Sequence, residues 1–249
     1  MAGHSHWAKV KRAKATTDAR RGREWSKLAR RIIVAAKAGG GNPEENLALR
    51  YAMDEARAAN MPNDTIDKAI RKGTGELGAE NYEPVIYEGL GPGGVAFLVE
   101  CLTNNRNRTA PEMRKIFERS GGQLGSLNSV AWMFQQKARF VISTGVVGED
   151  ALMELALDVG ADDVTTEGDV FQLVCQPGLF SKLKAALAEH GIPTVSARID
   201  MVPTATVPVG ADKAAQVLAL LEALEEHDDV QNVYTNFDIP EDVLTRMAK

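Results

Sequence analysis

The order of apolar segments between residues 139 and 203 limits the possible folds of this chain more than any other feature. Short runs of β-branched and aromatic residues predict strands, and apolar residues at three- and four-residue steps predict helices. The expected strands are residues 140–143, a short segment near Val164, 170–175 and 195–201, and the expected helices are 150–159 and 179–190. This β-α-β-β-α-β order is typical of a ferredoxin-like α+β unit.

The segments on either side of this unit predict a further α+β domain. Residues 84–88 and 95–102 are rich in β-formers and flank the glycine-rich sequence 89–94, so we expect a hairpin. The other expected elements are a helix opened by the capping box Thr109-Ala110-Pro111-Glu112 and ended by Gly121-Gly122, a strand at 130–134, strands at 204–209 and 230–237, and a helix at 212–226. We expect the C-terminal elements to complete the sheet begun at Pro84.

The N-terminal third predicts three helices. In residues 18–37, Trp25, Leu28 and Ile32 recur on one helical face, and three glycines stop the helix at residues 39–41. Asn42 is the expected cap of a second helix that runs to about residue 59, and a third helix ends at Gly73. The chain is therefore predicted to be α+β, with a basic helical domain (1–78), an α+β domain (79–135 plus 204–249) and an inserted ferredoxin-like domain (136–203).

Charge is distributed very unevenly along the chain. The net charge is −5, yet residues 1–37 contain 11 Lys and Arg against 2 acidic residues, and residues 76–249 contain 13 against 26. Such a basic end favours a polyanionic partner, because each Lys or Arg that neutralises a phosphate releases condensed counterions. The predicted nucleic-acid-binding residues are Lys9, Lys11, Arg12, Lys14, Arg20, Arg21, Arg23, Lys27, Arg30 and Arg31. The alternative interpretation is a solvated helix face that only confers solubility.

The second and third helices resemble a helix-turn-helix in spacing but not in charge. A short turn joins them, as that motif requires. However, Asp64 and Asp67 lie in the first turn of the would-be recognition helix, where phosphates would repel them. We therefore expect recognition of backbone or shape, which suits structured RNA at least as well as DNA.

A second candidate anion site lies where a strand leads into a helix. Arg106, Asn107, Arg108 and Thr109 would join two guanidinium groups with the free N–H groups of a helix N-terminus. The alternative is a capped turn whose arginines pair with Glu112 or Glu100.

Several classes of protein find little support in the sequence. Hydrophobic residues make up 44% and charged residues 25%, which excludes disorder along the whole chain, and no stretch is long and apolar enough to span a membrane. Cys101 and Cys175 fit no metal or redox spacing, and they predict buried thiols in a reducing cytosol. The G-x-G-x-x-G at residues 89–94 links two expected strands, so it is a turn rather than a dinucleotide motif. We expect no cofactor, no metal, no small-molecule substrate and no enzymatic activity.

Six motifs resemble those of the YebC/PmpR family over nearly the whole chain. They are M-A-G-H-S-H-W at the start, G-G-G-N-P-E-x-N, N-M-P-N-D-T-I-x-x-A-I-x-x-G-T-G, Y-E-G-x-G-P-G-G, E-C-L-T-N-N-R-N-R-T and G-G-x-L-G followed by S-V-A. The chain departs from the family pattern at His6, where many relatives have Lys, and at Asn104, where Asp is usual.

The resemblance implies a helical N-terminal domain, two intertwined α+β domains, and a cytoplasmic, non-enzymatic protein. Bacterial members are usually named DNA-binding transcriptional regulators, whereas a mitochondrial relative is a translational activator and some bacterial relatives are linked to ribosomes. Three hypotheses stay open: a DNA-binding regulator, an RNA- or ribosome-binding translation factor, and an acidic interaction scaffold whose basic arm only tethers it intramolecularly.

Overall fold

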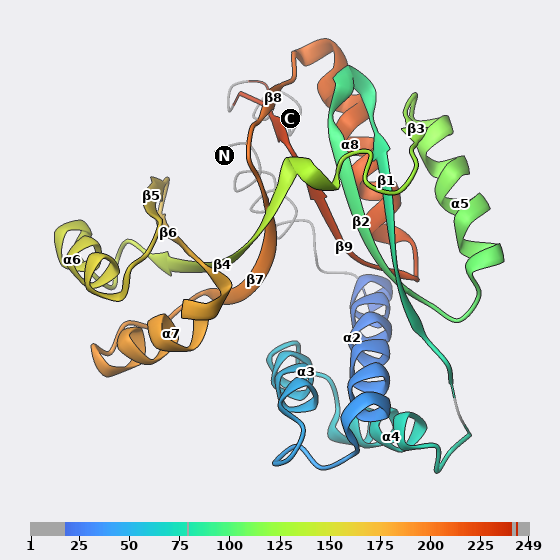
Figure 1. The fold of residues 1–249 in the computed structure, drawn as a ribbon, viewed down its shortest axis with the longest axis horizontal. Helices are drawn as coiled ribbons and strands as arrows, with labels where there is room; N and C mark the ends of the chain where they lie inside the picture. Colours follow the sequence, from blue (N-terminus) through green and yellow to red (C-terminus); the bar gives the residue numbers. More distant parts are fainter. Residues whose placement is uncertain (1–17, 79, 241–242, 244–249) are drawn as a thin grey trace.

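The computed structural model describes residues 18–78, 80–240 and 243, with the side chains from residue 21 onward. Figure 1 shows three parts, which are a group of helices, a four-stranded sheet with two long helices, and a second four-stranded sheet with its own two helices. The mixed α+β class predicted from the sequence is confirmed. The assignment of residues 1–78, 136–203 and the two remaining segments to separate domains stays a prediction.

The helical part consists of α2 (Asp18–Gly39), α3 (Leu47–Ala58) and α4 (Asn63–Thr74). Its core contains Ile32, Leu49 and Ile66, each at most 1% exposed. Helices α2 and α4 cross closely at Gly73, where an added Cβ would lie 2.6 Å from the carbonyl oxygen of Ile33. The three predicted helices are confirmed.

The predicted start of the second helix is wrong. Asn42 does not cap α3; its side chain accepts a hydrogen bond from the Glu44 N–H in a separate turn. Asn46 caps the helix by accepting from the Leu49 N–H, and its amide donates to the carbonyl oxygens of Ala35 and Gly40. A capping pattern alone does not separate these two asparagines, because the choice depends on contacts with α2. The third helix continues past Gly73 and ends at a left-handed Gly75.

The first sheet has the order β3-β1-β2-β9. Strands β1 (Glu83–Leu90) and β2 (Ala96–Thr103) form the predicted antiparallel hairpin around the 3-10 turn η1 (Pro92–Gly94). On the far side of β2 lies β9 (Val230–Thr235), so a C-terminal strand joins the sheet that begins with β1. The remaining short strands are β3 (Gln123–Leu124), β8 (Val207–Pro208) and β10 (Phe237–Asp238).

Helices α5 (Arg106–Arg119) and α8 (Ala211–Glu226) cover one face of this sheet. Phe97 from β2 meets Phe117 from α5 edge to face, with ring centroids 5.9 Å apart. Two predictions are wrong here. Helix α5 begins at Arg106 with Asn105 as its cap, one turn before the expected capping box at Thr109. Residues 130–134 are not a strand, because η2 (Ala131–Met133) occupies most of them and β4 begins at Phe134.

The second sheet has the predicted ferredoxin-like element order. It contains β4 (Phe134–Ser143), α6 (Glu149–Val159), β5 (Asp163–Glu167), β6 (Val170–Cys175), η3 (Pro177–Leu179), α7 (Phe180–Glu189) and β7 (Ser196–Pro203). The strands are arranged as β5-β6-β4-β7, and all neighbours are antiparallel. Phe134 from β4 packs with Leu98 from β2 and with Val130. This small apolar cluster joins the two sheets.

Candidate nucleic-acid interface

The ten predicted nucleic-acid-binding residues fall into three groups. Lys9, Lys11, Arg12 and Lys14 lie outside the described residues, as does the side chain of Arg20. Arg21 is exposed on α2. The other four, Arg23, Lys27, Arg30 and Arg31, contact the C-terminal part of the chain. The structure thus assigns an internal role to four cations that sequence reasoning had assigned to phosphates.

Three of these residues, Arg23, Lys27 and Arg31, connect α2 to the end of α8 and to β9. Lys27 Nζ donates to the carbonyl oxygen of Glu225, and Arg23 Nη2 lies 3.4 Å from Glu226 Oε1. Arg31 makes more contacts: Nη1 donates to both carboxylate oxygens of Glu55 at 2.8 Å. Its Nε and Nη2 donate to Gln231 Oε1 and Asn232 Oδ1 at 3.0 Å each. Apart from the Arg31–Glu55 pair, each bond joins residues about 200 positions apart, so helical propensity and periodicity do not reveal it.

The buried carboxylate of Asp229 connects α2 to α5. Arg108 Nη2 donates to Asp229 Oδ2 at 2.7 Å, Thr109 Oγ1 lies 2.7 Å from the same oxygen, and Arg30 Nη1 lies 3.4 Å from Oδ1. Asp229 is only 1% exposed. Burial raises the pKa of its carboxyl, but the bonds from Thr109 and Arg108 and the positive charges outweigh burial, so the pKa is lower than usual. We call Asp229, Arg30, Arg108 and Thr109 the Asp229 cluster.

The predicted second anion site overlaps this cluster. Carboxylates of the chain already contact its arginines: Arg106 pairs with Glu83 at 2.7 Å, and Arg108 pairs with Asp229 and lies 3.8 Å from Glu112. Thr109 is fully buried, whereas Asn107 is exposed. Pairing with Glu112 matches the alternative interpretation, and Glu100 instead accepts from Asn232 and Tyr234. Binding of an external anion at this site stays a prediction.

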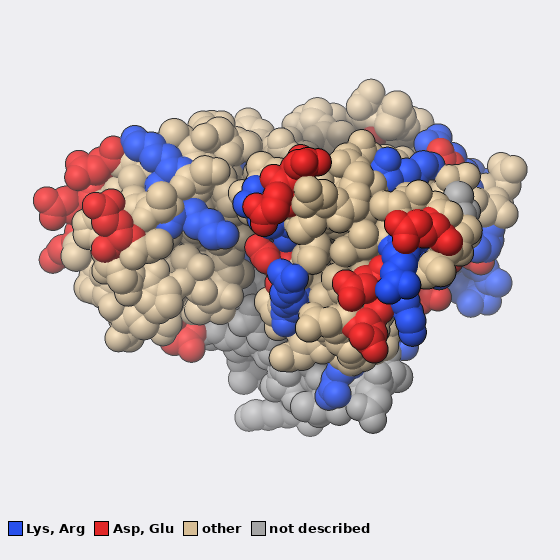
Figure 2. Space-filling view, turned by 90° about the horizontal axis from the view of Figure 1, so that it is seen from below, with Lys and Arg blue, Asp and Glu red and all other residues tan. Residues whose placement is uncertain are grey.

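Sequence reasoning missed an exposed set of cations further along α5. Arg114, Lys115 and Arg119 are exposed, and in the part of the chain that the structure describes they form no ion pair. Residues 76–249 are acidic overall, so a charge count over that range does not reveal these cations. A charge count over α5 alone does reveal them. On the face seen in Figure 2, Lys and Arg side chains alternate with Asp and Glu side chains, so its described part carries no continuous cationic surface.

Helix α4 lacks the charge of a base-reading helix. Asp64 and Asp67 are both exposed near its N-terminus, and Pro62 at the cap position provides no side-chain hydrogen bond. In helix-turn-helix proteins this end enters the major groove beside phosphates. The electrostatic objection raised from the sequence therefore applies to the folded chain as well.

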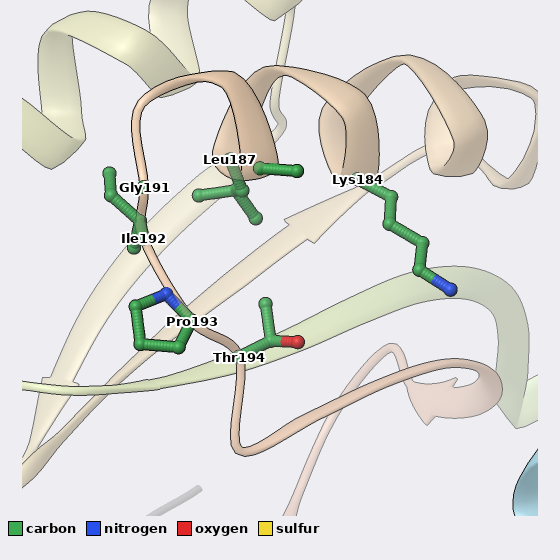
Figure 3. A pocket seen from close by; sticks show the side chains of 7 residues that line it. Lys184, Leu187, Gly191, Ile192, Pro193 and Thr194 are labelled. Carbon is green, nitrogen blue, oxygen red and sulfur yellow. The ribbon is translucent and has the colours of Figure 1, made fainter.

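A pocket of about 420 Å³ lies at the C-terminal end of α7. Figure 3 shows that Lys184 and Thr194 supply its polar groups beside Leu187, Ile192 and Pro193. The Lys184 ammonium also lies 5.8 Å from the ring centroid of Tyr51 on α3, which links the second sheet to the helical part. Among the described residues, no group of three His, Cys, Asp or Glu side chains is close enough to hold a metal ion. No described helix is long and apolar enough to cross a membrane.

Two family models together match most of the chain. The TACO1/YebC N-terminal domain matches residues 5–76, and the TACO1/YebC second and third domains match residues 82–237. The chain belongs to the TACO1/YebC family. The resemblance inferred from the six motifs is thereby confirmed.

Relatives in this family carry a regulatory name. A protein of Pelotomaculum thermopropionicum is 50% identical over 241 residues, covering 96% of this chain and 99% of the relative. A protein of Syntrophus aciditrophicus is 47% identical over the full length of both chains. Both are named probable transcriptional regulatory proteins. The crystal structure of a conserved hypothetical protein from Aquifex aeolicus has a TM-score of 0.81 and 45% identity, and covers 90% of this chain and 93% of its own.

Proposed function

We propose that this chain is a non-enzymatic, nucleic-acid-binding regulator of gene expression that acts in the cytoplasm. The observation that carries the proposal is the position of the basic residues relative to the docked part of α2. Arg23, Lys27, Arg30 and Arg31 are engaged within the chain, and the sequence places five further candidate cations, Lys9, Lys11, Arg12, Lys14 and Arg20, before them with one acidic residue, Asp18. The names of the relatives support DNA-binding transcriptional regulation as the first form of this function.

A specific observation also favours RNA as the nucleic acid. The exposed Asp64 and Asp67 leave α4 without the charge that major-groove reading requires, so specificity would come from shape and backbone contacts. An RNA-binding translation factor, acting on structured RNA or the ribosome, is therefore the second candidate. The scaffold hypothesis explains Arg23 to Arg31 as an intramolecular tether, but it leaves the earlier cluster of cations without a role.

The test measures the salt dependence of binding for a variant without four of these cations. Lys9, Lys11, Arg12 and Lys14 are replaced by Ala together in the full chain, and affinity for a duplex DNA and a structured RNA is measured across a salt series. Each lost phosphate contact lowers the slope of log K against log salt by about 0.9 for duplex DNA, so four contacts predict a decrease of about 3.6.

A matched control removes the same charge from other surfaces. It replaces four exposed cations by Ala, namely Arg50, Arg57, Lys182 and Lys213. The proposal predicts that this control keeps the wild-type slope. Equal slopes for both variants, or no binding of either polymer by the wild type at low salt, would contradict it. Tighter binding of the duplex supports the transcriptional form, and tighter binding of the structured RNA or co-sedimentation with ribosomes supports the translational form.

A further inference from the structure

An exposed loop without any charge lies between α5 and β4. Residues 120–136 contain no Lys, Arg, Asp or Glu, which makes them the longest uncharged stretch of a chain in which 25% of residues are charged. Such a stretch usually indicates a buried segment, yet Leu127 and Trp132 are 75% and 70% exposed. We call residues 125–133 the Trp132 loop. Single exposed apolar residues are common, but two on one short loop suggest a contact surface.

A buried carboxylate holds the backbone of the Trp132 loop in place. Glu88 on β1 is 2% exposed; its Oε1 accepts from the Asn128 N–H at 2.7 Å, and its Oε2 accepts from the Val130 and Ala131 N–H groups at 2.8 Å. Burial of a carboxylate is costly unless such bonds compensate for lost hydration. Three of them converge on one side chain, so the loop is ordered before any partner binds. Glu88 belongs to the motif Y-E-G-x-G-P-G-G, and the loop contains the end of another motif.

The indole of Trp132 is oriented by its own loop. Its Nε1 donates to the carbonyl oxygen of Ser129 at 3.2 Å. The only polar group of the ring is therefore satisfied internally, and the exposed surface that remains is the aromatic ring itself. A ring presented in this way is suited to stacking, because it loses little conformational freedom when a flat partner binds.

The charges around the loop favour a polyanion. Residues 76–249 contain 26 acidic residues, but none lies between 120 and 136, and the carboxylate of Glu88 beneath the loop is buried. Helix α5 packs against β3, from which the loop starts, and carries the exposed cations Arg114, Lys115 and Arg119, which form no ion pair with any residue that the structure describes. Aromatic side chains for bases together with nearby cations for phosphates are the usual components of a single-strand binding surface.

We propose that the Trp132 loop is a stacking site for an unpaired nucleobase. Trp132 is the stacking residue, and Glu88 is a positioning residue that fixes the loop. The inference rests on the proposed function, because the cations that hold the phosphates lie outside the loop. Bases within a duplex are stacked on both sides and offer no free face. The site therefore selects single-stranded segments or loops over regular duplex.

The test compares single-stranded and duplex probes with variants of the full chain. The probes are a 12-nucleotide oligouridylate, the equivalent oligothymidylate and a 12-base-pair duplex DNA, each titrated over a salt series. Stacking of one base is worth about 1–3 kcal/mol, so Trp132→Ala is expected to weaken single-strand binding about 5- to 150-fold. The salt slope and the duplex affinity stay unchanged, because no phosphate contact is lost. Trp132→Phe keeps an aromatic ring and restores binding to within about threefold.

A matched control and the folding state complete the design. Leu157 on α6 is 73% exposed, so Leu157→Ala removes an equally exposed apolar side chain from an acidic helix and leaves binding unchanged. Because Trp132 is exposed, its variants are expected to keep the wild-type melting temperature.

Two results separate this inference from the proposed function. If the wild type binds the oligonucleotides but Trp132→Ala binds them equally well, the stacking site is wrong, and the exposed indole serves another partner, such as a protein. If the wild type binds duplex DNA or a structured RNA but neither single-stranded probe at low salt, the inference fails and the proposed function stands; if it binds none of these, both fail. Equal sensitivity of oligouridylate and oligothymidylate supports recognition of the base, whereas loss with oligouridylate alone supports an RNA-specific site.

Discussion

Replacing Asp229 by Asn tests whether the Asp229 cluster anchors α2 to the first sheet. The carboxylate receives two bonds of 2.7 Å, from Arg108 and Thr109, and faces Arg30 at 3.4 Å. A hydrogen bond to a charged group contributes about 1.5–3 kcal/mol, and Asn keeps one acceptor oxygen, so about one such bond is lost together with the charge opposite two guanidinium groups. We expect the free energy of unfolding to fall by about 2–4 kcal/mol.

Thermal unfolding followed by circular dichroism measures this loss. In a chain of this size about 1 kcal/mol corresponds to a shift of roughly 2–4 °C, so the melting temperature is expected to fall by roughly 4–16 °C. Asp228, the neighbouring residue, is exposed, so Asp228→Asn is the matched control and changes stability by less than about 0.5 kcal/mol.

The pH dependence of this difference provides a second test. The pKa of Asp229 is lower in the folded chain than in the unfolded chain, so its ionised form stabilises the fold above the unfolded value of about 3.9. The stability gap between wild type and Asp229→Asn should therefore be constant near neutral pH and should shrink as the pH falls below about 4. A loss no larger than that of Asp228→Asn, or a gap that persists unchanged in acid, would refute the anchoring role.

Three further predictions follow from buried groups of the first sheet. Glu88→Gln is expected to lower the free energy of unfolding by about 1–3 kcal/mol, because three N–H groups lose a charged acceptor. It should also speed hydrogen exchange of the Asn128, Val130 and Ala131 amides. Glu118→Gln, at an exposed position of α5, is the control. Gly89→Ala is expected to lower the free energy of unfolding, measured in urea, by about 1–3 kcal/mol, because the added Cβ would lie 2.5 Å from Phe117 Cε1. Gly22→Ala, with open space around it on α2, should leave stability unchanged or raise it. Burial raises the pKa of Cys101 to about 12, so native protein at pH 8 should react with a thiol reagent only as fast as it unfolds; rapid labelling without denaturant would contradict this.

Local patterns were sufficient to predict most elements of the fold. The amphipathic spacing around Ile32 gave α2, the glycine-rich turn gave the β1–β2 hairpin, and the order of segments after residue 139 gave the ferredoxin-like sheet. Each of these signals lies within one element or between sequence neighbours. The errors occur where a contact with another element determines the local structure. A bond to α2 makes Asn46 rather than Asn42 the helix cap, and bonds to Glu88 hold residues 128–131 in a loop rather than a strand.

The candidate site was only partly accessible to sequence reasoning. A count of charges identified the basic N-terminal region, but it does not distinguish Arg31, which bonds to Glu55, Gln231 and Asn232, from a cation that faces solvent. The partners of Arg31 on β9 lie about 200 positions away. Pairing over such separations depends on the assembled fold. For the same reason, the sequence alone does not predict that Trp132 is exposed, because its exposure depends on how the loop lies on the sheet.

The position of β9 beside β2 has a consequence for the synthesis of the protein. Phe97 pairs with Thr235, so the first sheet receives one of its strands only after a further 138 residues have been translated. The unit from β4 to β7 is complete by Pro203, and its strand pairings join residues at most 69 positions apart, half the separation of Phe97 from Thr235, so they are expected to form faster. The unit from β4 to β7 is therefore expected to fold first, while the edge of β2 stays unpaired and prone to aggregation until residues 230–235 have been synthesised.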